Sequence, residues 1–173
     1  MLYLEDLKTG DRFTSRQYEM TLDEIKAFAG QYDPQEFHLD EEKAKEHPIF
    51  QGIAASGWHT SAVTMRLWTE CFPVVYGLIG SESSLRWPRP ARVGDLLHVE
   101  VEIVSVVPSK TKNDRGIVTY VNQTFNQKGE LLLVSTTKIV VFSRKYDYWT
   151  KLSFVQQFCE IFSYYYDNIN CKN

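Results

Sequence analysis

Cysteine is scarce, and no long hydrophobic run occurs in the sequence. The three cysteines, Cys71, Cys159 and Cys171, are widely spaced and form no CxxC motif, which indicates reduced thiols rather than a disulfide framework or a zinc site. No stretch of about 18 apolar residues is present, so we expect no transmembrane segment. The first eight residues include two acids and a lysine where a signal peptide needs an apolar run, and we therefore expect a cytoplasmic protein.

An excess of positive charge is also absent. Lysine and arginine number 19 against 22 aspartates and glutamates, a net charge of −3, which argues against a nucleic-acid partner bound through net positive charge. Neither a glycine-rich phosphate loop nor a GxSxG motif occurs, so we expect no serine nucleophile of that type. His47, His59 and His98 lack the mutual spacing of metal ligands, and we expect no metal site.

What is present is the composition of a folded globular protein. Its 173 residues are 43% hydrophobic and 24% charged, which predicts one domain with a short excess of chain. The sequence predicts helices over 21–30, 41–46 and 56–72, and a polar loop over 31–39. Thr21 and Glu24 form a capping box at the start of the first helix, and Pro73 cannot continue the last one.

Polar and apolar residues alternate after Gly80. Strands are predicted over 81–87, 97–107, 117–126 and 131–142. The last three follow one another with short connections, which favours an antiparallel meander. The 56–72 helix is apolar on much of its circumference and is the only predicted helix long enough to cover this sheet. The predicted fold class is therefore α+β, with one long helix against a curved antiparallel sheet.

The last 28 residues, 146–173, are rich in aromatic side chains. Leu152, Val155, Phe158 and Phe162 fall on one helical face, so we expect a helical C-terminal extension. The segment lacks the Lys/Arg-rich polar face of a membrane-surface helix, and we favour packing against the sheet or across a dimer.

The densest polar segment runs from Asp33 to His38. Its carboxylate and imidazole are five positions apart on a loop that Pro34 stiffens. Two such groups can take and give protons on one small molecule. A surface loop with a turn-capping aspartate and a solvated histidine is the alternative.

Two further segments could contact the same molecule. Small residues surround Ser56, where free N–H groups at a helix N-terminus could stabilise an oxygen that gains negative charge; ordinary helix capping is the alternative. Arg86, Arg89 and Arg92 form a local basic patch suited to phosphates or to a partner's carboxylates; a solvated turn is the alternative.

Together these segments resemble the MaoC-like dehydratase family, which has the hotdog fold. The resemblance is carried by residues 28–40, by 53–60, and by 85–95 with its RPxxxGD turn, and it extends over about residues 3–145. It implies a single hotdog domain over 1–145, in which a long antiparallel sheet wraps around a central helix, and a homodimer or higher homo-oligomer. Active members hydrate or dehydrate 2-enoyl thioesters of coenzyme A or of acyl carrier protein, usually with R stereochemistry, as in fatty acid metabolism.

Residue by residue, the resemblance implies Asp33 as the base and His38 as the proton donor. Gly57 matches the glycine whose N–H binds the thioester oxygen, and Ser56 beside it would contact the substrate. No cofactor is implied apart from the coenzyme A thioester, which is the substrate. The arginines that would contact its phosphates are Arg86, Arg89 and Arg92.

The sequence departs from the family's D-x-N-P-x-H motif. Gln35 stands at the asparagine position and Glu36 at the proline position. An acyl-CoA thioesterase remains an alternative, although such enzymes commonly place a carboxylate on the central helix, where Glu70, near the far end, is the only acid. A non-catalytic module that binds acyl thioesters is the other alternative, and it would not need the acid–base pair.

Overall fold

Six strands form one sheet in the order β1-β4-β5-β6-β3, with β2 also paired to β4. The structure is a computed structural model that describes residues 1–146. The strands are β1 (Arg12–Thr14), β2 (Tyr18–Glu19), β3 (Ile79–Arg86), β4 (Leu96–Pro108), β5 (Arg115–Phe125) and β6 (Leu131–Phe142). Every strand pair is antiparallel. The extension predicted over 146–173 lies, apart from Tyr146, outside the described residues.

The predicted meander consists of β4, β5 and β6. Its apolar residues, which alternate with polar ones along each strand, form much of the hydrophobic core. Leu97, Val99, Val101 and Ile103 on β4 are all buried, because alternate residues of a strand share one face. β3 begins two residues earlier than predicted and pairs with β6 rather than with a strand next to it in sequence. Since nothing pairs with its other side within the described chain, β3 is an edge strand.

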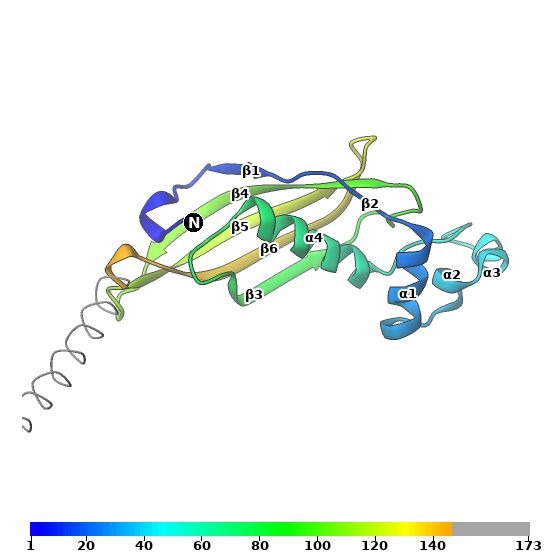
Figure 1. Cartoon of the computed structure of the whole chain (residues 1–173), viewed down its shortest axis with the longest axis horizontal. Helices are drawn as coiled ribbons and strands as arrows, with labels where there is room; N and C mark the ends of the chain where they lie inside the picture. Colours follow the sequence, from blue (N-terminus) through cyan, green and yellow to red (C-terminus); the bar gives the residue numbers. More distant parts are fainter. Residues whose placement is uncertain (147–173) are drawn as a thin grey trace, which may run out of the picture.

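The long helix α4 (Gly57–Cys71) covers the sheet, as predicted (Figure 1). Val63, Leu67 and Trp68 on its inner face are buried in the same cluster as the apolar residues of β4. The hydroxyls of Thr64 and Thr124 form a buried hydrogen bond of 2.7 Å, which joins α4 to β5. The predicted α+β class, a long helix against an antiparallel sheet, is confirmed.

Three shorter helices gather at the end of the molecule where α4 begins (Figure 1). They are α1 (Leu22–Tyr32), α2 (Glu36–Leu39) and α3 (Glu41–Glu46). Thr21 and Asp40 cap α1 and α3 as expected, and α1 continues two residues past Gly30. The prediction of a loop over 31–39 was wrong for α2. Phe37 stacks on the ring of Phe50, so this single turn is stabilised by packing that its local sequence does not reveal.

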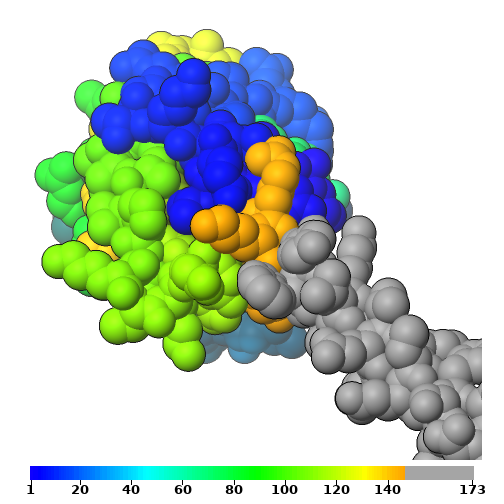
Figure 2. Space-filling view, turned by 90° about the vertical axis from the view of Figure 1, so that its left-hand side faces the viewer, coloured from blue at the N-terminus to red at the C-terminus, as the bar shows by residue number. Residues whose placement is uncertain are grey.

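The opposite end is closed by the N-terminal segment, which lies beside the residues after β6 (Figure 2). It contains the short 3-10 helix η1 (Leu4–Asp6). Arg144 pairs with Asp6 at 2.7 Å. A Cβ on Gly116 of β5 would lie 2.9 Å from the Leu4 side chain and 2.7 Å from the Val107 carbonyl oxygen, so glycine is required for this close packing.

Candidate active site

The ends of two helices bring Asp33 and His38 together. α1 ends at Tyr32 and Asp33 is its C-terminal cap. Pro34 follows, and Gln35 is the N-terminal cap of α2. This sharp change of direction places the Nε2 atom of His38 3.3 Å from the Oδ2 atom of Asp33. The structure therefore brings the two predicted acid–base residues into one site.

The imidazole of His38 is buried and fixed from its other side. Its Nδ1 lies 2.6 Å from the carbonyl oxygen of Ala54. Because a carbonyl only accepts hydrogen bonds, Nδ1 carries the proton of that bond, and Nε2 is the atom that faces Asp33. A second proton, on Nε2, would make the imidazole a donor to the carboxylate.

Asp33 lies in an environment that keeps its carboxyl group ionised. Burial opposes ionisation, but hydrogen bonds from Ser56 and Gln35 and the charge of His38 outweigh it and hold the pKa of Asp33 below its ordinary value. The Gln35 amide donates to Oδ1 at 2.8 Å. A carboxylate in this state can accept a proton at neutral pH.

The two departures from the family motif have separate places. Gln35, at the asparagine position, binds Asp33 directly, as described above. Glu36, at the proline position, forms an ion pair with Lys43 of α3, and its side chain is 69% exposed. The extra acid is therefore neutralised by a lysine at the surface instead of facing the imidazole of His38.

Ser56 lies behind Asp33 rather than in contact with open space. It is fully buried and caps α4, with its Oγ accepting a hydrogen bond from the Trp58 N–H at 3.2 Å. The same hydroxyl donates to the Asp33 carboxylate. Its geometry is that of a residue that positions Asp33, which differs from the substrate contact that the resemblance implies.

Gly57 is the first residue of α4, so the helix leaves its N–H without an internal partner. No hydrogen bond from this N–H occurs within residues 1–146. Gly57 lines a cavity of about 450 Å³ together with Asp33, Gln35 and His38. At this end the helix dipole favours negative charge, and a thioester oxygen can bind there.

Trp87 is part of this cavity although sequence reasoning gave it no role. Its indole lies against Gly57, where an added Cβ would come within 3.2 Å of the ring. Its Nε1 donates to the Ser61 hydroxyl at 3.2 Å. The only sequence signal for Trp87 was its position within the Arg-rich turn. No sequence signal indicated that the carbonyl of Ala54 would bind Nδ1 of His38.

The three predicted arginines have different surroundings. Arg89 is exposed and lines the cavity. Arg86 is exposed at the end of β3 and is not among the lining residues. The guanidinium of Arg92 is occupied by backbone carbonyls. It donates to the carbonyls of Phe50 at 2.6 Å, Gly52 at 2.8 Å and Ile53 at 3.1 Å. Arg92 thereby holds the 50–53 loop.

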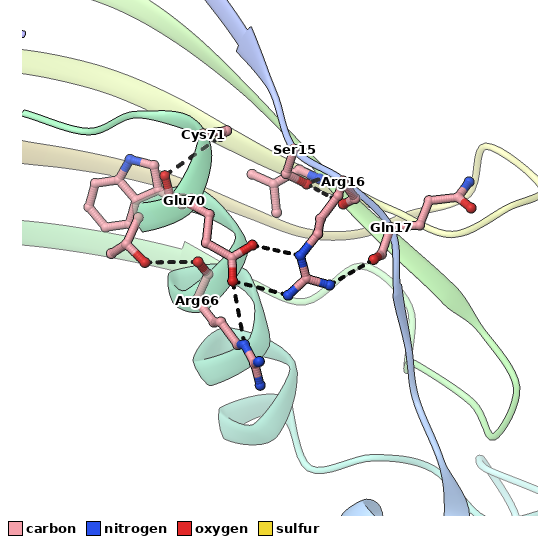
Figure 3. Close-up of polar contacts among 9 residues, drawn as sticks. Ser15, Arg16, Gln17, Arg66, Glu70 and Cys71 are labelled. Atoms are coloured by element: carbon pink, nitrogen blue, oxygen red, sulfur yellow. Dashed lines mark hydrogen bonds and ion pairs between the residues drawn. The ribbon is translucent and has the colours of Figure 1, made fainter. Parts of the chain in front are cut away.

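The only acid of α4, Glu70, lies near the end of the helix opposite to Gly57, where Arg16 and Arg66 surround its carboxylate (Figure 3). It is thirteen residues after Gly57, about 20 Å along a helix. Arg16 binds its carboxylate through two hydrogen bonds of 2.7 and 3.0 Å, and Arg66 lies 3.6 Å away. The bonds from Arg16 hold the pKa of Glu70 below its ordinary value. Glu70 therefore forms an ion-pair network that joins α4 to Arg16, in the segment between β1 and β2.

A second cavity of about 500 Å³ lies between α4 and the strands β3, β5 and β6. Trp58 lines both cavities. No motif or spacing in the sequence indicates this cavity. In the described part of the chain no three His, Cys, Asp or Glu side chains are grouped to hold a metal ion, and none of its helices is long and apolar enough to cross a membrane.

Three known proteins are similar to this chain, two of them in structure. The MaoC-like dehydratase from Rhodospirillum rubrum is 52% identical in sequence to this chain. Its crystal structure matches with a TM-score of 0.80 over 83% of this chain and 98% of that chain. The protein YdeM of Bacillus subtilis (strain 168) is 36% identical over 129 residues, which are 72% of this chain and 88% of YdeM. An (R)-hydratase from A. caviae involved in PHA biosynthesis is 24% identical and shares the fold, with a TM-score of 0.65 over 78% of this chain and 97% of that chain.

The family assignment rests on the matched span. A family model described as MaoC like domain matches residues 7–125. This span contains Asp33, His38 and Gly57 and ends with the last residue of β5. The chain therefore belongs to the MaoC-like domain family and has the hotdog fold of its dehydratases.

Proposed function

We propose that the protein is a hydratase or dehydratase of 2-enoyl and 3-hydroxyacyl thioesters of coenzyme A or of acyl carrier protein. The observation that carries the proposal is the Asp33–His38 pair, 3.3 Å apart, in one cavity with the free N–H of Gly57. An acid–base pair and an oxyanion donor are what addition of water to an enoyl thioester requires.

In the proposed hydration, Asp33 and His38 hold the reacting water. The carboxylate of Asp33 takes one proton from the water while its oxygen bonds to Cβ, and the electrons of the C=C bond move toward Cα and the thioester oxygen. The N–H of Gly57 stabilises the charge on that oxygen. The proton on Nε2 of His38 passes to Cα.

The pair is then restored by proton transfer between its own members. Asp33 has gained the proton of the water and His38 has given one to the substrate, and the two groups are 3.3 Å apart. Dehydration follows the same steps in reverse. No cofactor enters this chemistry besides the thioester itself. Arg89, exposed at the cavity, is the arginine best placed to meet a phosphate of coenzyme A.

We also propose that the chain assembles as a homodimer or a higher homo-oligomer. β3 is an exposed edge strand, with seven of its eight residues exposed. Trp58, Met65 and Ile79 are 61%, 50% and 45% exposed, and Trp58 and Met65 line the cavity beside β3, so exposed apolar side chains lie next to the open edge. We further propose that the protein is cytoplasmic and takes part in fatty acid metabolism, because enoyl and hydroxyacyl thioesters are its expected substrates.

The thioesterase alternative is less well supported. The acid that such an enzyme would use on the central helix is Glu70, which Arg16 and Arg66 neutralise at the far end of α4. A non-catalytic binding module would not need the Asp33 carboxylate to be kept ionised against burial.

The test follows the loss of the 2-enoyl absorbance of a short trans-2-enoyl-CoA with the wild-type protein and with Asp33→Asn and His38→Gln. We expect hydration without free thiol, and each variant to lose about 10²- to 10⁴-fold in kcat/KM. Glu70→Gln is the matched control and is expected to keep its activity. Release of free thiol would instead identify a thioesterase, and no turnover at any chain length would favour the binding module.

A further inference from the structure

Arg92 binds the chain segment that precedes α4 through both its side chain and its backbone. Its half-buried guanidinium donates to three carbonyls of the 50–53 loop. Its backbone forms an antiparallel bridge with Ala54, and the N–H of Ala55 donates to the carbonyl of Ala91 at 2.9 Å. The turn that contains Arg92 therefore fixes this segment at several successive peptide units.

The carbonyl that binds His38 lies between these fixed points. In the peptide unit before Ala54, the Ile53 carbonyl accepts from Arg92 at 3.1 Å, and the Ala54 N–H donates to the Phe37 carbonyl at 3.5 Å. In the unit after it, the Ala54 carbonyl lies 2.6 Å from Nδ1 of His38. A peptide unit is planar and turns as one body. Loss of the bond from Arg92 would therefore free the backbone angles of Ala54 and let its carbonyl leave Nδ1.

A second path leads from Arg92 to the same imidazole through aromatic rings. The guanidinium binds the carbonyl of Phe50 at 2.6 Å, and the ring of Phe50 stacks on Phe37 with centroids 4.6 Å apart. Phe37 in turn meets the ring of His38 edge-on at 4.3 Å. The hydrogen bond to Nδ1 and the packing beside the imidazole thus depend on one loop, which Arg92 holds.

The loop needs this support because of its own geometry. Gln51 has a φ of 51°, in the left-handed region that costs a residue other than glycine free energy unless its surroundings enforce it. Three carbonyl oxygens that converge on one point repel one another unless a donor lies between them. A guanidinium offers its N–H groups in a rigid plane, whereas the ammonium of lysine is a point charge on a flexible stem.

We propose that Arg92 is a positioning residue of the active site, which acts through the Ala54 carbonyl to keep a proton on Nδ1 of His38. An imidazole with this proton stays neutral after it gives the Nε2 proton to the substrate. The hydrogen bond at one ring nitrogen decides which nitrogen is protonated. This role differs from the phosphate contact that the resemblance implies for Arg92. Its effect on the rate rests on the proposed function, whereas its effect on the imidazole does not.

The experiment compares the wild-type chain with Arg92→Lys and Arg92→Ala. Nitrogen chemical shifts of the ¹⁵N-labelled imidazoles report the tautomer of His38 at a pH where the ring is neutral, and His38→Gln identifies its signals. We expect the Nδ1–H form in the wild type. In both variants the proton should move to Nε2, because the Asp33 carboxylate is then the acceptor that remains. With a trans-2-enoyl-CoA, kcat should fall by about 10- to 100-fold at a nearly unchanged KM.

Arg144→Ala is the matched control, because the guanidinium of Arg144 binds Asp6 at the opposite end of the molecule. It should keep both the tautomer and kcat, whatever stability it loses. An unchanged His38 tautomer in Arg92→Lys, or a rise in KM with kcat unchanged, would overturn the inference, and the second result would identify a phosphate contact instead. A shifted tautomer in a protein whose wild type hydrates no enoyl-CoA contradicts the proposed reaction alone, whereas hydration with an unchanged tautomer contradicts this inference alone.

Discussion

At the scale of single residues, the contact between Gly57 and Trp87 decides how closely a thioester can approach the start of α4. A side chain at position 57 would leave the N–H in place but would meet the indole ring at 3.2 Å. Trp87 is 40% exposed, so the ring can move, but it would then move within the cavity that the substrate enters. Glycine is needed here for space rather than for backbone freedom.

Gly57→Ala is therefore expected to lower kcat/KM by about ten- to a hundredfold without unfolding the protein. The added methyl group would displace the substrate or the Trp87 ring, and a small misplacement near the reacting atoms can lower the rate by up to about 10²-fold. The fold should be kept, because alanine is a better helix former than glycine. Steady-state kinetics and thermal unfolding measure the two effects. Adding Trp87→Ala to Gly57→Ala should restore part of the lost activity. Full activity in Gly57→Ala alone would mean that the contact has no part in catalysis.

The same scale shows where sequence reasoning reaches its limit. Asp33, His38 and Gly57 could be predicted because a motif fixes their spacing, and the structure places them around one cavity. The roles of the arginines could not be predicted, since residues three apart on a turn can point in unrelated directions. Arg92 turns back to the 50–53 loop, whereas Arg89 faces the cavity. Only the folded chain separates them.

At the scale of elements, the N-terminus of α4 couples helix stability to the ionisation of Asp33. One buried hydroxyl, that of Ser56, caps the helix and donates to the carboxylate. The lowered pKa of Asp33 means that its contribution to stability is present above the ordinary pKa of 3.8 and is lost as the pH falls below it. Removing the Ser56 hydroxyl acts on both properties.

We expect Ser56→Ala to lose about 1 kcal/mol of unfolding free energy as a lost cap and to raise the pKa of Asp33. The acid limb of the pH–rate profile should then move to higher pH, because Asp33 would be protonated earlier. Thr21→Ala is the matched control. It removes the cap of α1, with a comparable expected loss of stability, and should leave the acid limb in place. Equal pH profiles for both variants would contradict the coupling.

The elements themselves were largely predictable from local signals. The caps Thr21, Asp40 and Ser56 and the alternation of β4 set the helices and strands almost to the residue. α2 was not predicted, because a helix of four residues is too short to show a helical periodicity in the sequence. Its Phe37 is held by Phe50, thirteen positions along the chain, and such tertiary contacts override local preference.

At the scale of the whole molecule, the open side of the sheet is the feature that a lone chain does not explain. β1 and β2 cover part of the other edge by pairing with β4, but the outer side of β3 has no strand beside it in the described residues. An exposed edge offers unpaired N–H and C=O groups to a second strand. The meander was predictable because its strands are consecutive; the place of β3 at the edge depends on pairing with β6 across the fold and was not.

We expect the purified protein to sediment at about twice the 20.1 kDa of one chain, through a symmetric interface that includes β3. In a two-fold interface a substitution enters twice, so Ile79→Arg on β3 would bring two positive charges into the contact and shift the protein toward the monomer at micromolar concentration. Val104→Arg on β4 is the matched control, because Val104 is 47% exposed against 45% for Ile79 but lies away from this edge; it should leave the dimer intact. A monomeric wild type, or dissociation by both variants alike, would contradict an interface built on β3.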